Sequence, residues 1–274
     1  FAQAIRTIQD GLDGCNSLAL TTDGWTGNGM SFWSITVFAI NKKWNLVHYR
    51  LGCIPIFAPK HSALKLYHSI TKCLTDLGLD PNKVTSITTD EGGAAPLIAS
   101  HFPGSIEVHC MAHLLNTTLS NAFKEIAQTI PGVMLVMDSC KRIASSINHS
   151  VLRSEQLAVN QIHANEPVLT LKQQVDTRWN SWLALFRSIK SSEMSLVALL
   201  HANRKEFKIS DWVLSNSNYM FDVLDCLITV LDYFEIASKE SCKEDCPTSF
   251  VVIAQTLLLQ SQLTSFDFPD SHKN

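Results

Sequence analysis

Two short apolar runs of the sequence each lead into the same three residues, Thr-Thr-Asp, and they constrain how the chain can fold. The first, in Leu18–Thr26, is mostly apolar until it reaches Asp23, and we expect the strand to break at Gly24, so that Asp23 lies at the strand end. The second, Val84–Asp90, has the same Thr-Thr-Asp ending before a pair of glycines. We predict that both are strands. If they are parallel neighbours, their carboxyl ends coincide at one edge of the sheet, where open α/β sheets carry their chemistry. Asp23 and Asp90 would then lie together.

The other patterns in the first half predict three strands followed by crossover helices. Apolar and polar residues alternate in two stretches after the first strand, joined by a link short enough for a hairpin. Pro55 and Pro59 should then end this sheet, and Ser62 is a candidate N-cap for a helix that Gly78 terminates. The expected elements are a helix in 1–13, strands 18–23, 31–41 and 44–53, a helix 62–77, a strand 84–90, a short helix 96–101 and a strand 106–110.

This β-β-β-α-β-α-β order predicts an α/β layer fold with a mixed five-stranded sheet. It is the order of the ribonuclease H-like fold. From Ala112 onwards the strand patterns stop, and apolar residues recur at helical spacing. We therefore expect a ribonuclease H-like core in residues 1–130 and an all-helical region in residues 131–274.

Composition narrows the class of protein. A chain of 274 residues that is 46% apolar can build a sizeable core. Its net charge of -3 argues against a protein that binds nucleic acid through overall positive charge, although a local basic groove is compatible with it. Eight cysteines without a CxxC pair favour reduced thiols in an intracellular protein. No apolar run reaches the roughly 20 residues that span a bilayer, so we expect no membrane partner. Because the chain begins at Phe1, we expect a piece of a longer protein.

Four short islands resemble the transposases of the hAT superfamily, in particular its plant-type and zinc-finger-BED-associated branch. Each island is short, but their order and spacing together are specific. The resemblance covers nearly the whole chain and implies a ribonuclease H-like catalytic core with a helical insertion, acting on DNA in the nucleus as part of a transposable element. The islands are Thr21–Thr26 (TTDGWT), Ile87–Asp90 (ITTD), Cys110–Asn116 (CMAHLLN) and Thr177–Ser181 (TRWNS).

By this resemblance Asp23 and Asp90 are the first two catalytic acids. Taken singly, each could equally be an Asp that caps a turn. Two carboxylates a few ångströms apart repel each other, and a divalent cation is their natural neutraliser. Oxygen ligands favour Mg²⁺ or Mn²⁺. In the family, such ions activate a water or a 3′-hydroxyl for attack on a DNA phosphodiester.

Some expected parts of the family are missing. The third catalytic Glu, the C-terminal dimerisation region and the N-terminal BED finger have no match in this sequence, and Glu91 stands where the family usually has Asn. The resemblance implies that the intact parent, which would contain these parts, is a homo-oligomer that cuts DNA. The fragment should bind a metal ion without efficient cleavage.

Two further islands contain residues that the resemblance places next to DNA. Cys110 and His113 have the spacing of half a zinc site, but the sequence offers no second pair at a workable distance. The resemblance assigns them to DNA positioning, and the alternative is a buried thiol with a satisfied imidazole. Arg178 and Trp179 would contact DNA distorted at the cleavage junction, with the indole stacked on a base. The alternative is a core-facing aromatic stripe shared with Trp182.

Three functions remain open from the sequence. The first is the hAT-type transposase fragment, and the second is a non-catalytic nuclear module of the same fold that binds DNA or protein. The third, another ribonuclease H-like nuclease, is disfavoured because a plain nuclease needs neither the Cys110/His113 nor the Arg178/Trp179 island. A Glu encoded just downstream of Asn274 in the parent gene would separate the first two.

Overall fold

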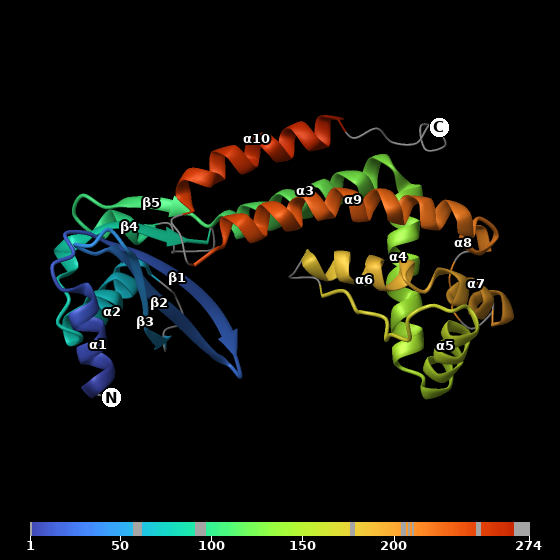
Figure 1. The fold of residues 1–274 in the computed structure, drawn as a ribbon, viewed down its shortest axis with the longest axis horizontal. Coiled ribbons are helices and arrows are strands. Elements are labelled where there is room, and N and C mark those ends of the chain that lie inside the picture. Colours follow the sequence, from blue (N-terminus) through green and yellow to red (C-terminus); the bar gives the residue numbers. More distant parts are fainter. Residues whose placement is uncertain are drawn as a thin grey trace. The chain divides into compact units, whose positions relative to one another are not determined.

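The computed structural model describes residues 2–56, 62–90, 97–175, 179–203, 207, 209, 211–244 and 248–265. The chain divides into two compact units, and Figure 1 labels their elements. The first unit contains residues 1–114 and 241–250, and the second contains residues 115–240 and 251–274.

The first unit ends earlier than the expected boundary at residue 130, because most of helix α3 (Met111–Thr129) packs with the later helices. The side-chain oxygen of Asn116 accepts a hydrogen bond from the main-chain N–H of Trp179 at 3.3 Å. The ring of Phe123 meets the ring of Trp182 edge-on, with the ring centroids 6.0 Å apart.

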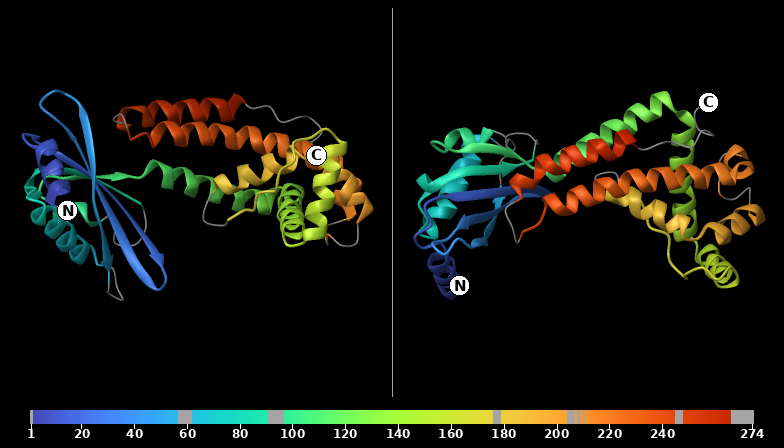
Figure 2. Two further views of the ribbon diagram at one scale, coloured as in Figure 1. Left: turned by 60° about the horizontal axis from the view of Figure 1, so that its bottom comes forward. Right: turned by 45° about the horizontal axis from the view of Figure 1, so that its top comes forward.

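A mixed five-stranded sheet, drawn in blue to green in Figure 2, forms the centre of the first unit. Its strand order is β3-β2-β1-β4-β5. Strands β1, β2 and β3 pair antiparallel, whereas β4 is parallel to both β1 and β5. The predicted α/β class and mixed sheet are therefore confirmed, and so is the parallel pairing of the two Thr-Thr-Asp strands. The strands are β1 Leu18–Gly27, β2 Met30–Ile40, β3 Leu46–Ile56, β4 Val84–Thr89 and β5 Ile106–His109.

Helices α1 (Ala2–Leu12) and α2 (Ala63–Asp76) contribute to the core on one face of this sheet. The Ser62 hydroxyl accepts a hydrogen bond from the main-chain N–H of Lys65, which confirms the predicted N-cap. The chain leaves α2 at Gly78, which has a positive φ of 72°. Two short 3₁₀ turns, η1 (Pro81–Lys83) and η3 (Ala99–His101), precede β4 and β5. In this core, strand and helix side chains form one buried cluster. It includes Leu20, Ile35, Val37 and Ile87 from the strands and Leu66, Ile70 and Leu74 from α2.

The second unit is built of helices, as the apolar spacing predicts. Arg187 on α6 bridges Asp232 and Glu235 of α9 at 2.6 and 3.1 Å, which ties these two helices together. In the part of the chain that the structure describes, no helix is both long and apolar enough to cross a membrane. The remaining helices are α4 Pro131–Asn148, α5 Val151–His163, α6 Asn180–Lys190, α7 Glu193–Ala202, α8 Asp211–Ser215, α9 Ser217–Ser241 and α10 Ser249–Ser265.

Two strand ends differ from the prediction. Strand β1 does not break at Gly24 but continues to Gly27, because β2 pairs with it along this whole length. Gly24 lies opposite Trp33, and a Cβ built on Gly24 would come within 2.8 Å of the indole of Trp33. Pro55 does not end β3 either, since it pairs with Phe32. Strand β3 is at the edge of the sheet, where proline is tolerated.

We predict that Gly24→Ala lowers the free energy of unfolding by about 1–3 kcal/mol, because the added methyl group overpacks the buried indole of Trp33. Gly27→Ala is the matched control in the same strand, since a Cβ there meets no atom within 4 Å. Urea unfolding of the two variants measures the difference. Equal stabilities for both variants would contradict this explanation of Gly24.

Candidate functional site

The strand register brings Asp23 level with Asp90. Thr21 of β1 pairs with Thr88 of β4 in the parallel ladder, and the same offset continued by two residues matches Asp23 with Asp90. Adjacent strands lie about 4.8 Å apart, so the two residues start from neighbouring backbone positions. Asp90 directly follows β4, whereas Asp23 lies inside β1 and pairs with Ser34 of β2. The prediction that Asp23 ends its strand was therefore wrong, but its position next to the end of β4 is as expected.

Asp23 extends from the sheet face opposite the helix-covered core. Leu20 and Thr22 of β1 are buried, and side chains alternate along a strand, so Thr21 and Asp23 occupy the other face. Asp23 itself is exposed. The hydroxyl of Ser34 donates to its main-chain oxygen at 3.3 Å, next to the β1–β2 pairing. The carboxylate is thus held on a rigid strand while it remains open to water.

The electrostatics link three groups at this site. Although Asp23 is exposed as a residue, the surrounding protein partly desolvates its carboxyl, which raises the pKa above its usual value, and repulsion from Asp90 raises this pKa further. The backbone N–H of Gly24 and the nearby His113 act in the opposite direction and lower this pKa. Asp23, Asp90 and His113 therefore lie close enough together for their charges to interact.

The start of helix α3 explains how His113 reaches the acids. The main-chain N–H of Cys110 donates to the carbonyl of Thr89 at 2.9 Å, which fixes the end of β5 next to the end of β4. The carbonyl of Cys110 then accepts a hydrogen bond from the N–H of Leu114 at 3.0 Å, which begins the helix. His113 lies in this first helical turn. Its position follows from the strand pairing that also positions Asp90.

The carboxylates of Asp23 and Asp90 suit one hard cation, provided that other molecules supply most of its ligands. Carboxylate oxygens are ligands of Mg²⁺ and Mn²⁺, and a bound cation would relieve the repulsion between Asp23 and Asp90. Among the described residues, no three His, Cys, Asp or Glu side chains are grouped closely enough to hold a metal ion by themselves. An ion here would need water or phosphate oxygens to complete its shell.

The last island lies in the second unit. Arg178 is outside the described residues. Trp179 is only 7% exposed, and its ring packs edge-on against Phe234 at 6.3 Å between ring centroids. These contacts support the core interpretation of Trp179. That it shares a face with the acids, and that it stacks on DNA, stay predictions. Trp182 is partly exposed instead, with the Lys141 ammonium 5.1 Å from its ring centroid.

Sequence reasoning missed a group of basic residues in the second unit. Lys141, Arg142 and Arg153 line one cavity there. Two of them are adjacent in the sequence, but such a pair is common on helix surfaces and predicts no particular site. Only the packing of α4 and α5 brings the third cation to them.

The raised pKa of Asp23 has a consequence for stability. A carboxyl whose pKa is higher in the folded state binds its proton more tightly there, so its ionisation destabilises the fold as pH rises through these pKa values. We predict that Asp23→Asn raises the free energy of unfolding at pH 7 in metal-free buffer. The gain should stay below about 1 kcal/mol, because water screens a partly exposed group.

This gain should shrink as pH falls towards and below the unfolded Asp pKa of about 3.9, where the wild-type carboxyl is also neutral. Urea unfolding at neutral and acidic pH measures both values. Asp10→Asn, an exposed change on α1, is the matched control and should show no such pattern. A loss of stability at pH 7 in Asp23→Asn would contradict the repulsion described here.

Comparison of the chain with protein-family models and with curated proteins gave no match.

Proposed function

We propose that this chain is the ribonuclease H-like core and helical insertion of a hAT-type DNA transposase, whose intact form cuts and rejoins DNA in a metal-dependent reaction. One observation carries the proposal: Asp23 in β1 and Asp90, directly after the parallel strand β4, are level with each other when the strand register is continued, and their charges interact. The sheet order β3-β2-β1-β4-β5, with three antiparallel strands followed by two parallel ones, is the order expected of a ribonuclease H-like core.

Asp23 and Asp90 would hold the Mg²⁺ or Mn²⁺ ion in this proposal. A bound ion would supply Lewis-acid activation of a water or 3′-hydroxyl and of the DNA phosphodiester. The chain itself contributes two carboxylates on rigid strands and the imidazole of His113 beside them. The His113 side chain would position a DNA phosphate at the acids, together with the half-buried Cys110 at the start of the same helix.

The proposal extends to the setting in which the protein acts. DNA would be the partner, the nucleus the location, and the intact parent would be a homo-oligomer. A chain with a net charge of -3 has only local basic groups to contact phosphates, so its affinity for DNA should be modest and should fall steeply with salt.

We predict that the chain binds Mn²⁺ weakly and that Asp23→Asn weakens this binding about tenfold or more, because one of two charged ligands is lost. Titration followed by Mn²⁺ electron paramagnetic resonance measures the free ion directly. Asp10→Asn makes the same change in net charge at an exposed position on α1, and this variant should bind Mn²⁺ as the wild type does. Equal binding by all three proteins would remove the metal site from the proposal.

We also predict little Mn²⁺-dependent nicking of supercoiled plasmid by this chain. Two carboxylates can hold one ion, whereas the family reaction uses two ions, and the second lacks a carboxylate ligand. Robust nicking that is lost in Asp23→Ala would contradict this ligand count. It would show that two acids suffice or that another acid of the chain completes the site.

A second candidate is a non-catalytic module of the same fold that binds DNA or protein in the nucleus. The burial of Trp179 favours it, because an enclosed indole cannot stack on a base without leaving its core. The two candidates differ in metal dependence. Affinity for DNA that is unchanged by a chelator and by Asp23→Asn, together with no Mn²⁺ binding, would favour the module.

A further inference from the structure

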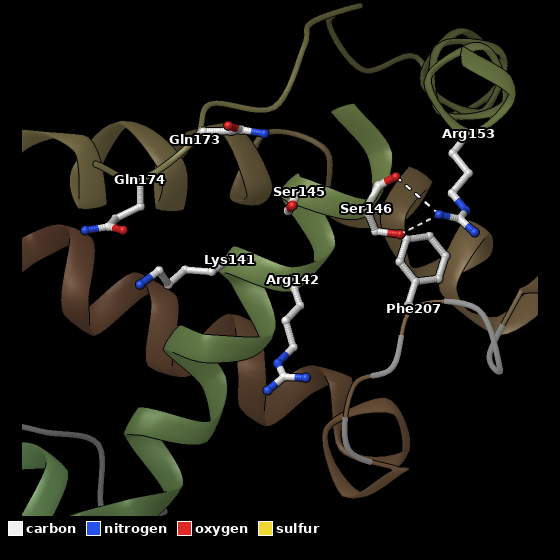
Figure 3. Close-up of a pocket in the computed structure, with 8 residues that line it drawn as sticks. All are labelled: Lys141, Arg142, Ser145, Ser146, Arg153, Gln173, Gln174 and Phe207. Atoms are coloured by element: carbon white, nitrogen blue, oxygen red, sulfur yellow. Dashed lines mark hydrogen bonds between the residues drawn. The ribbon is translucent and has the colours of Figure 1, made fainter. Parts of the chain in front are cut away.

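The helical unit contains a basic cavity that is separate from the acid pair. The cavity has a volume of about 680 Å³ and is lined by residues of α4, α5, the segment before α6 and Phe207 (Figure 3). Three of these residues are cations: Lys141 and Arg142 come from α4, and Arg153 comes from α5. None of the described residues that line the cavity is acidic. This grouping of cations occurs in a chain whose net charge is -3.

Neutral hydrogen-bonding groups complete the wall. Ser145 follows Lys141 by four residues and Ser146 follows Arg142 by four residues, so each pair shares a row along the helix and the two rows are neighbours. Gln173 and Gln174 add amide groups from the segment before α6. Hydroxyl and amide donors next to Lys and Arg form a lining rich in donors, which suits a ligand whose surface consists of acceptor oxygens.

Arg153 is fixed in place by its neighbours. Its Nη1 donates to the hydroxyl of Ser146 at 2.7 Å and to the carbonyl of Ser146 at 3.3 Å. Its guanidinium carbon also lies 5.5 Å from the ring centroid of Phe207, which is only 2% exposed. Because contacts on two sides hold the guanidinium, less side-chain entropy is lost when a ligand binds beside it. Figure 3 shows these hydrogen bonds as dashed lines.

We propose that this cavity binds phosphate oxyanions through Lys141, Arg142 and Arg153. Arg matches the geometry of phosphate oxygens, and three cations suit a ligand with several negative charges. The volume lies within the range of about 300–1,000 Å³ that is usual for small-ligand sites, and it exceeds what one phosphate needs. It suits the linked phosphates of a nucleotide or successive phosphates of a nucleic-acid backbone. The site does not depend on Asp23, Asp90 or the proposed reaction.

The test compares two phosphate sources on the full chain. Pyrophosphate binding is measured by isothermal titration calorimetry, and binding of a short labelled DNA duplex by fluorescence anisotropy. Lys141→Gln and Arg142→Gln each remove one charge from the cavity. Each should weaken binding about tenfold, the scale of one charge-assisted hydrogen bond. Lys124→Gln removes the same charge from an exposed position on α3 outside the cavity lining and should have no such effect. Circular dichroism confirms that each variant is folded.

Saturable pyrophosphate binding with this variant pattern supports the proposal and identifies free phosphorylated molecules as the ligand source. The same pattern with the duplex alone also supports it and identifies backbone phosphates. In that case the dependence of affinity on salt should fall by about one counterion for each cation removed. The proposal is overturned if neither probe binds, or if folded Lys141→Gln and Arg142→Gln bind no more weakly than Lys124→Gln.

Discussion

The parallel pairing of β1 with β4 is the interaction on which the candidate acidic site depends. It buries Leu20 and Ile87 side by side in the core of the first unit, both fully enclosed. The same register carries Asp23 and Asp90 to matching positions on the opposite face. Since strand side chains alternate, a slip by one residue would turn Asp23 into the apolar core. Burial of the apolar face thus fixes where the two charges lie, and the fold maintains their repulsion at a cost in stability.

Much of the first unit could be predicted from the sequence, because its signals are local. The Ser62 cap, the positive φ of Gly78 and the alternating strands each act within a few residues. The errors arose where a distant residue decides the outcome. Strand β1 continues past Gly24 because β2 pairs with it there, and Pro55 is tolerated because β3 is an edge strand. Neither fact can be read from a window of the sequence.

The second unit was predictable as helix but not as a packed structure. Apolar spacing marks which face of a helix is buried, but not which helix covers it. The pairing of Arg187 with acids of α9 joins residues more than forty positions apart, and the cavity cations come from two helices. The motif at Trp179 points towards DNA, whereas its packing against Phe234 points towards a core role. Charge is likewise local: a chain that is acidic overall contains a basic cavity in one unit and an acid pair in the other.

The central claim is that one divalent ion binds between β1 and β4. Iron(II) can replace Mg²⁺ at carboxylate sites, and with ascorbate and peroxide it generates radicals that cut the backbone close to the ion. Mapping these cuts by mass spectrometry tests the claim directly. Cuts around both Asp23 and Asp90, suppressed by excess Mg²⁺ and absent in Asp23→Asn, are the result we predict. Cuts near only one of these residues, or a pattern unchanged in Asp23→Asn, would contradict a shared ion at this site.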